Sequence, residues 1–130
     1  MTVFSKIIAG EIPCYKVAES SDFFAFLDIN PLVKGHVLVV PKKEEDYIFD
    51  LDDKTLGDIM IFSKRVAKAI KKAIPCKRIG VTVIGLEVPH AHIHLIPISK
   101  ESDIIFNKYR QKLTSDEFKE IAAAISEKFE

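Results

Sequence analysis

Net charge, long apolar runs and paired cysteines are all missing from this sequence of 130 residues. Lysine and arginine together number 19, and so do aspartate and glutamate, so the formal net charge is zero. A balanced chain has no global attraction for nucleic acid or for an anionic membrane, and we expect neither as a partner. No apolar run approaches the ~18 residues that indicate a transmembrane helix.

The first residues and the two cysteines bear on the cellular compartment. The segment from Met1 to Lys6 lacks the basic and then apolar layout of a secretory signal, so we expect a cytoplasmic protein. Cys14 and Cys76 lie far apart, and neither belongs to a C-x-x-C pair. In a reducing compartment we expect two free thiols, and we do not expect a cysteine-based zinc site.

The order of the predicted elements indicates an α+β domain over residues 1–130. A short helical turn is expected from Phe4 to Ala9, and apolar, aromatic and β-branched runs predict strands at 15–19, 23–28, 35–41, 78–84 and 90–98. An i, i+3, i+4 pattern from Leu56 to Ile74, followed by Pro75, predicts a long helix. Thr114 and Glu117 fit a capping box that opens a last helix. Strands grouped around one crossover helix favour a mostly antiparallel sheet of about five strands.

Histidine is also scarce, but three of the four histidines alternate with apolar residues. These three are His90, His92 and His94. On a helix, His92 would oppose the other two, whereas on a strand a spacing of two places all three imidazoles on one face. The apolar residues of the same strand, which would then enter the core, are Ala91, Ile93 and Leu95.

Two kinds of chemistry suit such a row of imidazoles. Two histidines spaced by two can share a zinc ion, with a third ligand from another strand such as His36. All three from one strand can hardly converge on one ion, because neighbouring same-face positions lie about 6.6 Å apart. Alternatively, imidazole titrates near pH ~6.5, so one ring can attack a phosphorus atom while another donates a proton.

The segment from His90 to Pro97 resembles the signature of the histidine-triad (HIT) family, in which three histidines alternate with apolar residues. Residues 4–13, 25–31 and 35–42 are similar to other blocks of that family, in the same order. The resemblance covers residues 3–98 and leaves 99–130 as a C-terminal extension. The resemblance implies a HIT-like fold, and the chain is most similar in pattern to the nucleotide-binding, phosphoramidase-like branch. Several blocks in the same order are a more specific signal than a single short motif.

The resemblance implies a homodimeric enzyme that acts at the α-phosphorus of a purine nucleotide and needs no cofactor or metal. His92 would be the nucleophile and would form a covalent nucleotidyl-histidine. His94 would contact the phosphate and protonate the leaving group. His90 and His36 would orient the nucleophile and relay protons.

The same resemblance implies a nucleoside pocket. Asp28 would bind both ribose hydroxyls, which suits a carboxylate acting as a double acceptor. Glu87 would lie near the leaving group, where an acid repels further phosphates and attracts a cationic amine, which favours phosphoramidate or aminoacyl-type substrates. The apolar walls around the base would be Val3, Phe4, Ile7, Phe26, Leu27 and Ile29.

Several positions depart from the family's pattern. Val83 and Leu86 occur where many members have an Asn and a Gln that touch phosphate, which leaves a dinucleoside polyphosphate hydrolase or a nucleotide sensor with weak catalysis as alternatives. Thr2 and Ser5 take the places of a cysteine pair, and Glu44 the place of a histidine, that hold structural zinc in many bacterial relatives. We therefore expect no structural zinc here.

Overall fold

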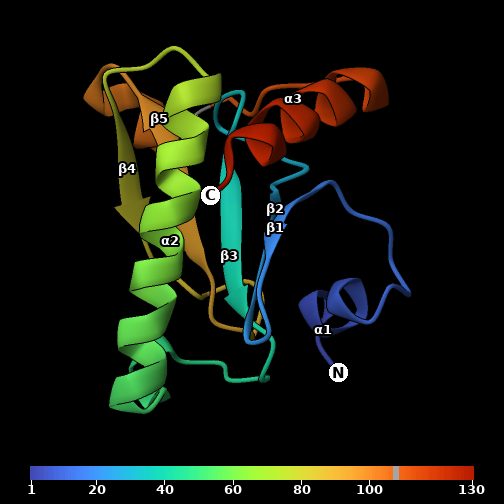
Figure 1. Ribbon diagram of the computed structural model, residues 1–130, viewed down its shortest axis with the longest axis vertical. Helices are drawn as coiled ribbons and strands as arrows, with labels where there is room; N and C mark the ends of the chain where they lie inside the picture. Colours follow the sequence, from blue (N-terminus) through green and yellow to red (C-terminus); the bar gives the residue numbers. More distant parts are fainter. Residues whose placement is uncertain (107–108) are drawn as a thin grey trace.

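The protein is described by a computed structural model over residues 1–106 and 109–130. One antiparallel sheet has the strand order β1-β2-β3-β5-β4 (Figure 1). The strands are β1 (Lys16–Glu19), β2 (Phe23–Leu27), β3 (Val37–Pro41), β4 (Arg78–Thr82) and β5 (Ile93–Ile98). The helices are α1 (Val3–Ile8), α2 (Asp53–Ala73) and α3 (Ser115–Lys128), with short 3₁₀ turns η1 (Ile48–Asp50) and η2 (Glu101–Ile104). The predicted α+β class with a five-stranded antiparallel sheet is confirmed.

Local signals set the ends of the two longer helices. The Asp52 carboxylate accepts a hydrogen bond from the Thr55 backbone N–H at 2.7 Å, which caps the start of α2. The predicted capping box is present at α3, where the side chains of Thr114 and Glu117 each accept from the other residue's backbone N–H. Within the described part of the chain, none of the helices combines the length and the apolar character needed to cross a membrane.

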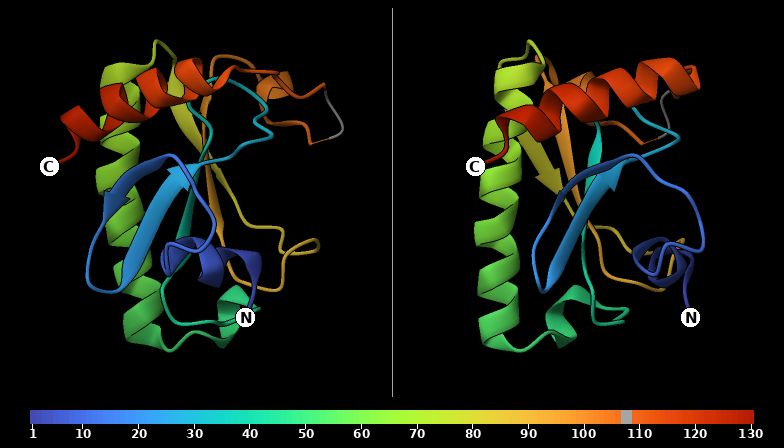
Figure 2. Two further views of the ribbon diagram at one scale, coloured as in Figure 1. Left: turned by 90° about the vertical axis from the view of Figure 1, so that its right-hand side faces the viewer. Right: turned by 45° about the vertical axis from the view of Figure 1, so that its right-hand side comes forward.

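The central strands of the sheet are buried on both faces, because their alternate residues pack in two directions. Phe23, Ala25 and Leu27 of β2 pack in the larger core with α2 and α3, whereas Phe24 and Phe26 point to a smaller core that includes Phe4 of α1. The right-hand view of Figure 2 accordingly shows α1 and α2 on opposite sides of the strands. The α1 side carries the candidate site described below. Cys14 and Cys76 are free thiols, as predicted.

The histidine row differs from its prediction, because β5 begins at Ile93 and not at residue 90. The Ala91 backbone N–H donates to the carbonyl of Glu45 in a loop, so the chain before Ile93 is not paired with β3. Only His94 therefore lies within the strand, and the three imidazoles do not share one strand face. The prediction that Ala91 and the apolar residues of the strand enter the core is confirmed for Ala91, Ile93 and Leu95.

A glycine fixes the path of the chain into His36. Gly35 has a φ of +92°, and a Cβ atom at this position would lie 2.9 Å from Cγ1 of Ile74 and 3.3 Å from Cγ of Pro97. Glycine alone tolerates both the positive φ and this close approach. The carbonyl of His36 then accepts from the Asp28 backbone N–H at 2.9 Å, which brings the ends of β2 and β3 together.

Candidate active site

A cavity of about 430 Å³ opens on the α1 side of the sheet. A volume of this size is typical of small-molecule sites, whose walls are mostly apolar with a few polar groups. His92 and His94 line it, whereas His36 and His90 are not among its lining residues and are almost fully buried. The cavity also brings together every residue that the sequence predicted for nucleotide binding, namely Val3, Phe4, Ile7, Phe26, Leu27, Asp28, Ile29 and Glu87.

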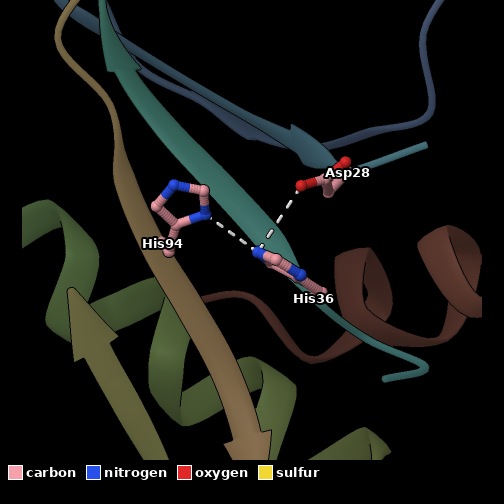
Figure 3. Close-up of side chains that lie close together, drawn as sticks. All are labelled: Asp28, His36 and His94. Atoms are coloured by element: carbon pink, nitrogen blue, oxygen red, sulfur yellow. Dashed lines mark hydrogen bonds and ion pairs between the residues drawn. The ribbon is translucent and has the colours of Figure 1, made fainter. Parts of the chain in front are cut away.

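His36 and His94 form a buried hydrogen-bonded pair (Figure 3). Nε2 of His36 lies 2.9 Å from Nδ1 of His94. The tautomers follow from a third group, because Nδ1 of His36 accepts a hydrogen bond from the Leu32 backbone N–H at 3.1 Å. The proton of neutral His36 is therefore on Nε2 and is donated to Nδ1 of His94. This leaves the proton of neutral His94 on Nε2.

Both members of this pair are held in the neutral form. Burial lowers the pKa of His36 to about 3, with further lowering by the positive charge of Arg110. Burial likewise lowers the pKa of His94 to about 3, and His36 adds to the effect, while the Asp28 carboxylate acts in the opposite direction. A neutral His94 can donate from Nε2 without carrying a permanent charge, and a nearby anion would raise its pKa.

Asp28 completes the group drawn in Figure 3. One of its carboxylate oxygens lies 3.6 Å from Nε2 of His36, and because His36 is neutral this is a polar contact and not an ion pair. The other oxygen accepts from the Asn30 backbone N–H at 2.8 Å, which fixes the turn after β2. The carboxylate thus faces the cavity from a fixed turn while keeping acceptor capacity for a ligand.

His92 is oriented by the main chain. Its Nδ1 lies 2.7 Å from the carbonyl oxygen of His90, so Nδ1 carries the proton and donates it to this acceptor. Nε2 of neutral His92 consequently has an available lone pair. The ring is also held by edge contacts with Phe4 and His94, each with ring centroids 5.0 Å apart. A fixed imidazole with a free lone pair in a cavity is suited to nucleophilic attack.

His90 is anchored by both of its ring nitrogens. Nε2 donates to the carbonyl of Pro41 at 2.8 Å, and Nδ1 accepts from the Thr2 hydroxyl at 2.7 Å. The Glu44 carboxylate in turn accepts from the Thr2 backbone N–H and from the Ser5 hydroxyl, at 2.8 and 2.6 Å. The three positions that the sequence singled out in connection with structural zinc, Thr2, Ser5 and Glu44, thus form one hydrogen-bonded cluster with His90, which joins α1 to the segment before β5.

The tautomers of the histidines disfavour the zinc site that the sequence raised as an alternative. Among the described residues, the atoms best placed to share a metal ion belong to Asp28, His36 and His94, within 4.8 Å of one another. A ligating imidazole nitrogen needs a lone pair, yet Nε2 of His36 carries a proton because the Leu32 N–H occupies Nδ1. The hydrogen-bond pattern therefore disfavours a metal ion at these atoms.

Sequence reasoning missed two cavity residues in the C-terminal extension, Phe106 and Arg110. The Phe106 ring packs edge-on against His94, with ring centroids 4.9 Å apart. Arg110 donates to the carbonyl of Asn30 at 2.7 Å. No local pattern marks these positions, because each reaches the cavity through contacts with residues distant in the sequence.

Comparison with known proteins gives a consistent match. The family model described as HIT domain matches residues 9–101. An uncharacterized HIT-like protein of Borreliella burgdorferi is 36% identical over 132 residues, which cover 95% of each chain. Adenosine 5'-monophosphoramidase of Saccharomyces cerevisiae is 41% identical over 96 residues, or 73% of this chain and 61% of the yeast protein. The crystal structure of a Hit-like protein from Bartonella henselae, with an unknown ligand, has a TM-score of 0.85 at 33% identity and covers 98% of this chain and 96% of that chain.

Proposed function

Because this chain belongs to the histidine-triad (HIT) family, we propose that it hydrolyses a nucleoside 5'-phosphate derivative at the α-phosphorus. The observation that carries the proposal is that one cavity holds two ring nitrogens, one with a free lone pair and one with a proton. Nε2 of His92 offers a lone pair, and Nε2 of His94 offers a proton. A nucleophile beside a proton donor is the arrangement that displacement at phosphorus requires.

In the first half of the reaction, Nε2 of His92 forms a bond to the α-phosphorus as the bond to the leaving group breaks. The N–H on Nε2 of His94 donates to the leaving group, which departs with a proton that solvent supplies, while Nδ1 of His94 keeps its hydrogen bond from His36. In the second half, a water molecule attacks the phosphorus as the bond to Nε2 of His92 breaks, and the proton of that water returns to solvent.

The residues around the two reacting rings have supporting roles in this scheme. His90 orients the nucleophile through its carbonyl, and its own ring is fixed by Pro41 and Thr2. His36 fixes the tautomer of His94. Asp28 binds the ribose hydroxyls from the turn after β2, and the predicted apolar residues form the walls around a purine base.

Glu87 supports an amine as the leaving group. Glu87 is an exposed residue of the cavity lining, where its carboxylate would repel additional phosphates and attract a cationic group. The name of the yeast relative, an adenosine 5'-monophosphoramidase, supports the same substrate class. Phosphoramidates are therefore favoured over dinucleoside polyphosphates.

A substrate panel tests the proposed function. We expect the purified protein to release AMP from adenosine 5'-phosphoramidate with a kcat/KM about 10-fold above that for diadenosine polyphosphates, since one unfavourable carboxylate–phosphate contact at the rim of the cavity costs about 1.4 kcal/mol. AMP release is followed by chromatography. Tight AMP binding without turnover of any substrate would instead identify a nucleotide sensor.

The partner proposed for the chain is a second copy of itself. In the described sheet, β4 pairs with β5 alone and forms one edge, and Val81 on this edge is 51% exposed. An exposed apolar edge strand is a template for pairing with another chain, and a two-fold axis would pair β4 with its own copy.

We expect sedimentation to give the mass of two chains and the Val81→Asp variant to give the mass of one, because a desolvated charge opposes the pairing. Glu101→Gln on η2 is a control that should leave the mass unchanged. A single-chain mass for the unaltered protein would contradict the dimer.

A further inference from the structure

Two residues of the C-terminal extension, Arg110 and Gln111, lie beside the candidate site. The Gln111 backbone N–H donates to the carbonyl of Pro31 at 2.8 Å, and Nη1 of Arg110 donates to the carbonyl of Asn30 at 2.7 Å. Both acceptors belong to the loop that follows Asp28. The C-terminal extension is therefore fastened to the part of the cavity where the proposed ribose-binding carboxylate lies.

The Phe106 ring contacts both Arg110 and the hydrogen-bonded pair His36 and His94. Its ring packs edge-on against His94 and His36, with centroids 4.9 and 6.2 Å apart, and the Arg110 guanidinium carbon lies 5.4 Å from the centre of the same ring. Arg110 thus stands one aromatic ring away from the proposed proton donor. Its own side chain lines the same cavity as His92 and His94.

The charges that line the cavity do not suit a phosphate without Arg110. Two of the lining side chains, Asp28 and Glu87, are carboxylates, and His94 is neutral. The nearby stretch from Ile84 to Leu86 offers no polar side chain. Among the described lining residues, Arg110 is the one with a permanent positive charge, and an anion in a partly desolvated cavity needs such a counterpart.

We propose that Arg110 binds the phosphoryl group of the nucleotide and so sets the preference of this site for an anionic ligand. The inference rests on the proposed function and adds a residue from the extension to it. A guanidinium has five N–H donors, and the bonds to the carbonyls of Asn30 and Phe106 leave further donors for the ligand. Those two bonds also hold the guanidinium in place before a ligand arrives, which reduces the entropy lost on binding.

Binding measurements with AMP and with adenosine separate a contact between Arg110 and the phosphate from an effect of Arg110 on the rest of the site. In Arg110→Gln we expect the Kd for AMP to rise about 10- to 100-fold, because a charge-assisted hydrogen bond is lost, while the Kd for adenosine stays unchanged. Arg110→Lys keeps the charge without the planar fork of donors, and its Kd for AMP should lie between those of the unaltered protein and Arg110→Gln. Arg65→Gln on α2, whose Nε donates to the carbonyl of Glu130, is the matched control and should bind both ligands as the unaltered protein does.

Each other result overturns a defined part of the proposal. Equal weakening of AMP and adenosine in Arg110→Gln would make Arg110 a structural residue of the loop, and unchanged AMP binding would remove it from the phosphate site. Thermal unfolding of each variant shows whether it remains folded. If the unaltered protein binds AMP no better than adenosine, the proposed function fails, and the role of Arg110 fails with it.

Discussion

Replacing His92 by alanine should reduce the turnover of adenosine 5'-phosphoramidate by at least about 10³-fold, because the covalent route is lost. None of the other three histidines can substitute for this nucleophile. The Nε2 atom of His94 carries a proton, His36 has both nitrogens in hydrogen bonds, and His90 is anchored by Pro41 and Thr2. AMP should still bind to His92→Ala, since the phosphate contacts of His94 remain. The measurement is kcat by chromatographic detection of AMP.

The covalent intermediate provides a positive counterpart to that loss of activity. Rapid acid quench of the unaltered protein with substrate, followed by mass spectrometry of its peptides, should locate a nucleotidyl group on His92. The His92→Gln variant keeps a side chain of similar size in the cavity and should give no adduct. Normal turnover by His92→Ala, or an adduct on a different residue, would reject the mechanism.

Acidification should destabilise the protein well above the pH at which native His36 and His94 titrate. The pKa of both His36 and His94 is lowered to about 3 by burial, whereas an unfolded histidine titrates near pH ~6.5. The unfolded chain therefore binds more protons than the native chain between these values, and its stability rises with pH across this window. The contribution is complete above pH ~6.5 and is lost as the pH falls towards 3.

The expected slope is steep because two rings contribute. His36 and His94 each lower the free energy of unfolding by up to about 1.4 kcal/mol for every unit by which the pH falls within the window. Denaturant titrations at several pH values from 7 to 4 measure the slope. The double variant His36→Gln/His94→Gln keeps polar groups at both positions without titration, and its slope should be clearly shallower. Equal slopes for the two proteins would show that these histidines are not held neutral.

Much of the fold follows from signals that act over a few residues. The capping box at Thr114 and Glu117 was predictable because both partners lie within one helical turn, and so was the end of α2 just before Pro75. The alternation around the histidines correctly placed Ala91 and Leu95 in the core. The blocks that resemble the HIT family also indicated which residues gather at one cavity, and His92, His94 and Asp28 do line it.

The sequence by itself thus determined most of the elements, the family and many of the residues that gather at the cavity, because periodicity, caps and motifs are local properties. Only the tertiary structure decided how each ring is held. The start of β5 depends on a bond from Ala91 to a distant loop, and the neutral state of His36 depends on burial by the whole fold. Arg110 meets Asn30 across 80 positions of sequence. Such contacts form only in the folded chain, so no local sequence pattern could predict that the C-terminal extension reaches the site.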